Sequence, residues 1–386
     1  MTELEEITEL DRLCEAFKEV RKASAWKTST QRYEADVLVQ SLALQKEVRS
    51  GTYRQRELLH FTLNERGKER DIHAPAVRDR VLQKVVNQDI LLKCLRKYLI
   101  YDNFASLPER GTSLARKRHL IHLRDFVAKH GVEGYILQID IHHYFDSINH
   151  EICWKMVESR IPESVQLLVK YLIENASEGD AGLNLGSEVP QTLAVYYLHP
   201  VDDYCKIVKG VKHYGRYMDD IYIFGESKGA LRELLAGIKE QLAALGLRVN
   251  ERKTHIVKLS HGYTFMQLKY RILPNKKILV APVPARITRE RRKLKAYKRL
   301  RDAGKLSMQE IQNAYKSWRQ CIIRDCSCTR SVLNLDALYG ELFGEAPDAN
   351  RKRDSRRIRR DIPDAPWEKH FIITETPFTA RIGTYI

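Results

Sequence analysis

The chain has 386 residues, of which 43% are hydrophobic and 30% are charged, and its formal net charge is +16. This composition favours a folded protein of two or three structural modules. No stretch approaches 18 uninterrupted apolar residues, so a membrane span is excluded. The pI near 9.4 predicts a polyanionic partner, with nucleic acid as the first candidate and a basic protein without such a partner as the alternative.

The N-terminal part of the chain predicts helices, then a hairpin, then another helix. Apolar residues recur at helical spacing over 3–50. Residues 57–63 alternate like a strand, "NERGKER" is typical of a turn, and 70–74 can form the return strand that ends at Pro75. From Arg78 onward the apolar residues follow the pattern of an amphipathic helix.

The middle of the chain predicts strands between helices. A basic helix is expected over 114–130, and "YILQIDIHHYF" predicts the strand that follows it. Residues 151–175 are expected to be helical, "SEGDAGLNLGSEVPQ" reads as a glycine-rich loop, and a helix follows at "TLAVYYLHPVDDYCKIVKG". The strand pair in "YGRYMDDIYIFG", a helix over 228–245 and short strands to about 280 complete this region. The pattern predicts an α+β fold with an antiparallel sheet.

The C-terminal part of the chain is basic. Residues 285–345 predict a helical module that begins with many Arg and Lys residues. The tail, 346–386, carries the charge run "RKRDSRRIRR" and then three prolines. A run of this kind is commonly a solvated segment, and a phosphate-binding arm is the alternative.

Asp219 and Asp220 pose a problem, because they interrupt an apolar strand pair. Two like charges are costly in such a setting unless a positive group lies beside them. Asp140, which follows another apolar strand, could share metal ions with them. Carboxylates from separate strands are what a pair of divalent ions requires for phosphoryl transfer. The sequence therefore predicts a two-metal site, with a solvated Asp-Asp turn as the alternative.

Five motifs, taken in order, resemble those of the reverse transcriptases, most closely the bacterial group II intron-like and diversity-generating-retroelement types. They are "GKERDIHAPAVRDRVLQ" (67–83), "DIHHYFDSI" (140–148), "GLNLGSEVPQ" (182–191), "YMDD" (217–220) and "GLRVNERKT" (246–254). The segments "ITRERRKLK" and "YKSW" resemble the thumb of these enzymes. The sequence departs from the usual motifs at Asn184 and Pro190, and at "YTFMQLKYRI", where relatives carry the primer-grip hairpin.

The resemblance implies a right-hand polymerase with fingers, a palm that contains an antiparallel sheet, and a helical thumb. The expected divisions are a helical extension (1–55), fingers (56–134, with part of 150–195), palm (135–280), a basic thumb (281–345) and a basic tail (346–386). The implied activity is that of an RNA-directed DNA polymerase, a nucleotidyltransferase that extends a 3′-OH with dNTPs. The implied cofactor is two Mg²⁺ ions, with Mn²⁺ as an alternative, and the implied partners are an RNA template and a DNA or RNA primer.

The roles of single residues follow from the matching positions. The implied catalytic metal ligands are Asp140, Asp219 and Asp220. The implied dNTP contacts are Lys68 and Arg70 at the triphosphate, Phe145 under the sugar where it would exclude a 2′-OH, Gln191, and Lys253, for which a general acid and a plain surface lysine are both open. The expected nucleic-acid contacts are Tyr217, Met218, Arg289, Arg291, Arg292, Lys293 and Lys295.

The resemblance also implies a cytoplasmic, bacterial or phage-encoded enzyme that serves a gene-diversifying retroelement or antiphage defence. A structured non-coding RNA or an accessory protein would be a further partner, and no membrane is expected. The alternatives are a catalytically idle RNA-binding relative, and a template-independent or RNA-making nucleotidyltransferase. The remaining acids near the motifs, Asp146, Asp202 and Asp203, are interpreted as ordinary solvated residues.

Overall fold

The computed structural model describes residues 1–22, 24–65, 68–184, 186–327 and 330–344. The chain divides into two compact units, Met1–Leu279 and Val280–Ile386. Within the described ranges, no helix is both long enough and apolar enough to cross a membrane. The predicted basic tail, 346–386, lies outside the described residues.

Helices form the N-terminal part of the first unit, as the sequence predicts. They are α1 (Glu3–Ile7), α2 (Leu10–Lys22), α3 (Thr28–Ala35), α4 (Val37–Arg49), α5 (Val77–Val85), a π-helical segment (Val86–Leu91), α6 (Leu92–Leu95) and a 3₁₀ turn (Arg96–Tyr98). The apolar stripe of α2 buries Leu13, Phe17 and Val20, and α2 packs against α4 and α5. The apolar residues that recur at helical spacing therefore form the face through which these helices pack together.

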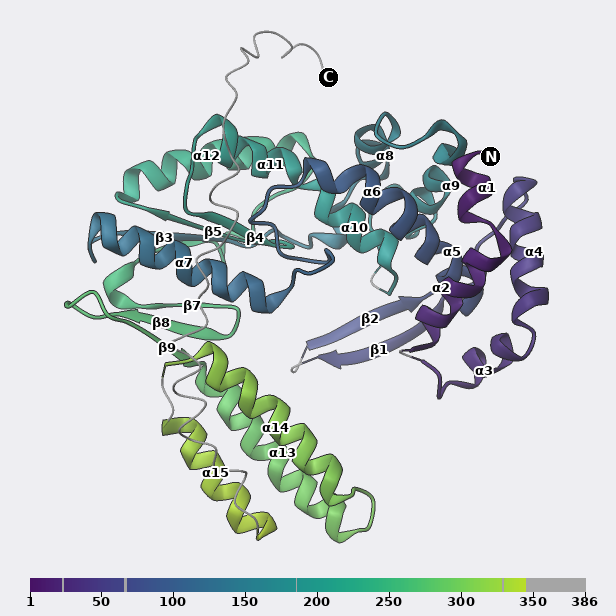
Figure 1. Ribbon diagram of the computed structural model, residues 1–386. Helices are drawn as coiled ribbons and strands as arrows, with labels where there is room; N and C mark the ends of the chain where they lie inside the picture. The colour runs from purple at the N-terminus through teal and green to yellow at the C-terminus, as the bar shows by residue number, and fades with distance from the viewer. Residues whose placement is uncertain (23, 66–67, 185, 328–329, 345–386) are drawn as a thin grey trace. The chain divides into compact units, whose positions relative to one another are not determined.

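Between α4 and α5 the chain forms a two-stranded antiparallel hairpin of β1 (Leu59–Glu65) and β2 (Lys68–Ala74) (Figure 1). The register pairs Leu59 with Ala74 and Glu65 with Lys68. Most of the stretch that was predicted to be a turn, 64–70, is therefore strand. Strong strand formers do not occupy that stretch, and it is the cross-strand pairing that holds it extended.

A four-stranded antiparallel sheet lies at the centre of the first unit, with the order β4-β5-β3-β6. Its strands are β3 (Tyr135–Ile139), β4 (Tyr214–Tyr217), β5 (Asp220–Gly225) and β6 (His255–Lys258). The middle strands are buried along most of their length, which agrees with their apolar sequences. The observed mixture of helices and antiparallel strands confirms the α+β class.

Helices cover the two faces of this sheet, α7 (Thr112–His130) on one side and α12 (Lys228–Ala244) on the other (Figure 1). His119 of α7 is fully buried, and its ring lies 4.4 Å from that of Tyr222 and 4.4 Å from that of Phe265, centroid to centroid. Burial lowers the pKa of His119, so this imidazole is neutral and belongs to the aromatic core.

Four further helices connect β3 to β4: α8 (His150–Glu158), α9 (Glu163–Glu174), α10 (Glu188–Tyr197) and α11 (His199–Asp203), which continues into a π-helical segment (Tyr204–Val208). Most of 151–175 is helical, as predicted, but the helical conformation is interrupted between α8 and α9. Pro162 precedes the first residue of α9, and a proline cannot donate the hydrogen bond that an uninterrupted helix would need there.

A second sheet, with the order β7-β8-β9, follows β6. Its strands are β7 (Tyr263–Phe265), β8 (Leu268–Ile272) and β9 (Ile278–Pro282), and the boundary between the two units falls within β9. The β7–β8 turn consists of Met266 and Gln267, which both have positive φ angles, 46° and 63°. Two-residue hairpins prefer this backbone, although it usually selects Gly or Asn.

After the last residues of β9, the described part of the second unit forms three helices, α13 (Pro284–Asp302), α14 (Met308–Asp325) and α15 (Arg330–Phe343). Their buried faces share a small core that includes Leu294, Ile311, Tyr315 and Leu335. The Tyr315 hydroxyl donates a hydrogen bond to Asp336 at 2.8 Å. The unit is thus a helical module with its own core, over the residues for which the sequence predicts helices.

Candidate active site

The two adjacent aspartates lie at the tip of the β4–β5 hairpin. Tyr217 pairs with Asp220, so the connecting turn consists of Met218 and Asp219 alone. Met218 has a φ of 58°, a left-handed conformation that costs a residue with a side chain of order 1–3 kcal/mol. Such strain persists only where the surrounding structure fixes it, which makes this turn a candidate functional element.

Asp140 is the first residue after β3, and Asp220 is the first residue of the neighbouring strand β5. The last pair between β3 and β5 joins Ile139 to Ile221, and continuing this antiparallel register by one residue places Asp140 opposite Asp220. Residues that face each other in this way project from the same side of a sheet. The sequence prediction that Asp140 and the Asp-Asp pair come from separate strands of one sheet therefore agrees with this register.

The pKa of Asp220 reflects this crowding. Burial among neighbouring atoms, together with the charges of Asp219 and Asp140, raises the pKa of Asp220 to about 7. At the same time the residue keeps an exposed surface, so its carboxyl is crowded by protein on one side and open to water on the other. A cation placed among the three aspartates would relieve their mutual repulsion.

Lys253 supplies such a positive charge to Asp140. Its Nζ lies 2.9 Å from both Oδ1 and Oδ2 of that carboxylate. The same segment fixes the backbone of Asp140, because the Asn250 amide donates to the Asp140 carbonyl at 2.7 Å. The lysine is half exposed, yet it contacts a predicted site residue, so a plain surface lysine does not describe it.

The donor set of the three aspartates fits Mg²⁺, which prefers carboxylate oxygens. The Lys253 ammonium is paired with Asp140 in the place where a metal ion would bind that carboxylate. The carboxylates of the three aspartates do not all lie close together. Among the described residues, a group of three metal-binding side chains with ligand atoms within 4.8 Å of one another is found only at a different place in the fold. Bringing them onto one ion requires the side chains, and the Lys253 contact, to rearrange.

A second positive group, Arg216, lies beside the acidic turn and was not predicted. Its side chain is fully buried and forms a two-pronged ion pair with Asp202, at 2.8 Å from Nε to Oδ1 and 2.6 Å from Nη2 to Oδ2. Nη1 donates to the Met218 carbonyl at 3.1 Å, and Nη2 donates to the Val195 carbonyl at 2.9 Å. Arg216 therefore connects the strained turn to α10 and α11.

The interpretation of Asp202 as a solvated acid was wrong. Asp202 is fully buried, and its carboxylate is satisfied there by the ion pair with Arg216 and by a hydrogen bond that the Tyr214 hydroxyl donates. Asp203 is half-buried, and burial together with the charge of Asp202 raises its pKa to about 6. Asp146, in contrast, is largely exposed, as expected.

Phe145 and the glycine-rich loop lie together. Phe145 is half-buried, and its carbonyl accepts a hydrogen bond from the Leu183 amide at 2.8 Å. Gly186, with a φ of 150°, lies against β2, where an added Cβ would come 2.8 Å from the His73 carbonyl oxygen. The loop prediction was wrong at its end, since Pro190 and Gln191 belong to α10, where a proline in the first turn is tolerated.

The other predicted contacts are placed as follows. The Gln191 Oε1 atom accepts a hydrogen bond from Ser106 at 3.1 Å. Tyr217 and Met218 are half-buried against the small cluster of Ala105, Leu107 and Val195. Lys68 and Arg70 lie in β2, and the structure describes only their backbone. The five basic residues of α13 that were predicted to contact nucleic acid are all exposed, and they belong to the second unit: Arg289, Arg291, Arg292, Lys293 and Lys295.

The antiparallel sheet and its acidic hairpin define an α+β polymerase fold, and with it the nucleotidyltransferase class. The chain belongs to the family described as "Reverse transcriptase (RNA-dependent DNA polymerase)", whose model matches residues 62–277. The predicted α+β polymerase fold and the resemblance to the reverse transcriptase family are thereby confirmed. No curated protein matches the chain.

Solved structures similar to the chain include telomerases of two Candida species. One is telomerase from Candida albicans in complex with a fragment of telomeric RNA, with 12% identity, a TM-score of 0.49, and coverage of 79% of this chain and 56% of that one. Another is apo telomerase from Candida tropicalis, with 13% identity, a TM-score of 0.46, and coverage of 78% and 63%. The chain thus spans less than two thirds of the length of these telomerases.

Proposed function

We propose that the chain is a reverse transcriptase that extends a primer 3′-OH with dNTPs on an RNA template by a two-metal reaction. The observation that carries the proposal is the register that sets Asp140 opposite Asp220, beside the Met218–Asp219 turn. Burial, together with the charges of Asp219 and Asp140, raises the pKa of Asp220, so three carboxylates at this end of the sheet are unfavourable unless they bind a cation.

The residues of the chain divide the work of this reaction among them. The three aspartates would hold two Mg²⁺ ions, with Mn²⁺ as a possible substitute. When bound, the ions would activate the attacking 3′-hydroxyl and steady the leaving pyrophosphate. Lys253 would leave Asp140 as the metal arrives, and its ammonium would then be available to the triphosphate. Lys68 and Arg70 would contact the triphosphate from β2, and Gln191 would orient the nucleotide against the template.

We assign fingers to 56–134 with part of 150–195, the palm to 135–280 and the basic thumb to 281–345. The helices of 1–55 are an N-terminal extension, and 346–386 is a basic tail. In this scheme the central sheet is the palm and the β1–β2 hairpin belongs to the fingers. The exposed Arg and Lys residues of α13 would follow the phosphates of the template and primer.

Primer extension by the purified full chain tests the proposal. With Mg²⁺, dNTPs and a primed RNA template, products are expected to extend to the template end and to follow its sequence. Addition without a template, or addition of ribonucleotides alone, would overturn the proposal in favour of a terminal transferase or an RNA polymerase. RNA binding without any incorporation would instead indicate an idle, RNA-binding relative.

Replacing Phe145 with Ala is expected to relax sugar selection. If the ring lies under the incoming sugar, removing it opens space for a 2′-OH, and the preference for dNTP over rNTP should fall about 10-fold or more. Single-nucleotide incorporation assays with each dNTP and its matching rNTP measure this ratio. Phe145→Tyr keeps a bulky ring and should keep the selection, while an unchanged ratio in Phe145→Ala would contradict the assigned role.

Neutralising α13 is expected to flatten the salt dependence of nucleic-acid binding. Each lost phosphate contact reduces the slope of log K against log salt by about 0.7–0.9. The triple variant Arg289→Gln/Arg292→Gln/Lys293→Gln should therefore lower the slope by about 2 to 3, measured on a primed RNA. Lys155→Gln/Lys170→Gln, which removes exposed charges of α8 and α9, should leave the slope unchanged.

We place the biological role in a gene-diversifying retroelement or in antiphage defence, as the motif resemblance implies. A structured non-coding RNA or an accessory protein would then be a partner, and a bacterial or phage-encoded cytoplasmic enzyme is the setting. Sequencing the RNA and DNA that copurify with the chain from its native host separates the two roles, because a diversifying element would copy one defined template repeatedly.

A further inference from the structure

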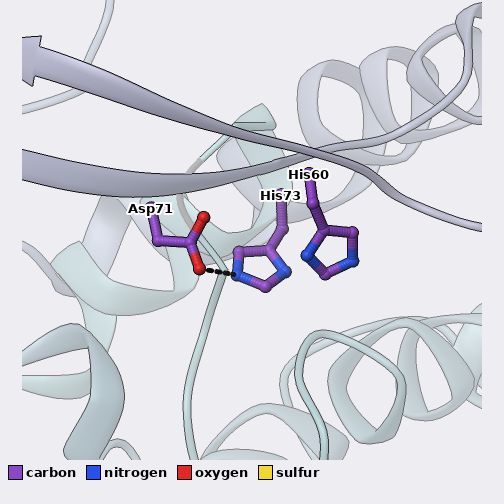
Figure 2. Close-up of side chains that lie close together, drawn as sticks. All are labelled: His60, Asp71 and His73. Carbon is purple, nitrogen blue, oxygen red and sulfur yellow. Dashed lines mark ion pairs between the residues drawn. The ribbon is translucent and has the colours of Figure 1, made fainter.

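The β1–β2 hairpin carries a second group of metal-binding side chains, separate from the three aspartates. His60 lies on β1, and Asp71 and His73 lie on β2 (Figure 2). One ligand atom from each of the three lies within 4.8 Å of the other two. We propose that these residues bind one transition-metal ion of the Zn²⁺ class and that the ion clamps the two strands of the hairpin.

The backbone register explains why these three side chains meet. His60 on β1 pairs directly with His73 on β2. Asp71 lies two residues before His73 on β2, opposite Thr62. Residues paired across a hairpin, and residues two apart along a strand, share a face. Figure 2 shows the three side chains projecting from the same side of the two strands. The cluster therefore follows from the fold and does not depend on one chance side-chain rotation.

The distances suit a small ion with nitrogen and oxygen ligands. Nε2 of His73 lies 3.3 Å from Oδ2 of Asp71, and the rings of His60 and His73 lie 4.1 Å apart between centroids. Zinc bonds of about 2.0–2.2 Å, arranged tetrahedrally, place neighbouring ligand atoms roughly 3.3–3.5 Å apart. Two imidazoles and one carboxylate favour Zn²⁺ over Mg²⁺, and the fourth position would be left to water.

The hairpin has reason to need such a clamp. A two-stranded hairpin is marginally stable in water by itself. Here the apolar side chains of Leu59, Phe61 and Leu63 are largely exposed, so packing contributes little to holding β1 on β2. A metal with one ligand on β1 and two on β2 joins the strands directly. The same ion would fix the backbone at His73, against which Gly186 of the glycine-rich loop lies.

The competing interpretation is an ordinary ion pair between His73 and Asp71, with His60 as a bystander. A metal titration of the full chain separates the two, after chelation and removal of the chelator. Asp219→Asn serves as the background protein, so that the aspartate site contributes as little as possible. Calorimetry is expected to show saturable binding of one Zn²⁺ per chain, and Co²⁺ in its place should give the visible absorbance of a tetrahedral site.

Variants of the same protein complete the test. His60→Ala and His73→Ala are each expected to weaken Zn²⁺ binding by at least about 10-fold, since even partners behind the ligands matter to that extent. His261→Ala removes an exposed imidazole elsewhere and should bind as the parent does. Equal binding by His60→Ala and the parent, or no saturation in the parent, would overturn the proposal and leave the ion pair.

Hydrogen exchange gives a second readout that does not involve nucleotide addition. Zn²⁺ is expected to slow exchange of the β1 and β2 backbone amides in the parent and in His261→Ala, and to leave His60→Ala unchanged. Slowing that is equal in His60→Ala would contradict the clamp. Because neither measurement uses template, primer or dNTP, failure of the clamp and failure of the proposed polymerase activity can be told apart.

Discussion

Replacing Asp219 or Asp220 with Asn is expected to reduce nucleotide addition at least about 100-fold, while the protein stays folded. Loss of a partner that only supports a metal ligand already costs about 10–100-fold, and these carboxylates are assigned as ligands themselves. Asn has nearly the same shape as Asp, so the change removes the charge that holds the ion and little else. Single-turnover incorporation at saturating dNTP measures the effect.

The stability of the same variants separates chemistry from folding. An acid with a raised pKa destabilises the folded state once it ionises, so stability is lost as the pH rises through about 7 for Asp220. At pH 8 without metal, both Asn variants should therefore melt at the same temperature as the parent or higher. Asp146→Asn is the matched control, because Asp146 is exposed in the same motif, and it should keep full activity. Full activity in Asp219→Asn would contradict the site assignment.

The candidate site could be predicted from sequence to the extent that local patterns determine it. Asp140 follows an apolar strand, and the Asp219–Asp220 pair interrupts another, so each was visible as a charge in the wrong setting. The register that sets Asp140 opposite Asp220 is a property of the sheet, and no local pattern reports it. The prediction that Asp140 lies near Asp219 and Asp220 depended instead on the order of the motifs along the chain, which is the order found in the family.

Features that depend on pairing between distant segments were missed. Asp202 and Arg216 are 14 residues apart and meet only when α11 packs beside β4. A signal existed, since an arginine inside an apolar strand requires a buried partner. His60 and His73 were invisible for the same reason, because they face each other only in the β1–β2 register. The Met266–Gln267 turn lacks the Gly or Asn that its backbone usually selects, so turn chemistry could not predict it.

Breaking the Arg216–Asp202 pair is expected to destabilise the protein strongly. Arg216→Met leaves the Asp202 carboxylate buried without its partner, which costs about 3–5 kcal/mol of the free energy of unfolding. Urea unfolding of parent and variant measures the difference. Lys239→Met is the matched control, because Lys239 pairs with Glu251 on the surface, and its loss should cost less than about 1 kcal/mol.

The double variant Asp202→Leu/Arg216→Met then separates stability from positioning. Replacing both members of a buried pair by apolar side chains is often nearly neutral, so stability should return to within about 2 kcal/mol of the parent. Nucleotide addition should stay at least about 10-fold low, because the Met218 carbonyl has lost the guanidinium that holds the strained turn. A double variant that is both stable and as active as the parent would show that Arg216 serves folding alone. Activity that stays low in a stable protein makes Arg216 the residue that positions the two aspartates.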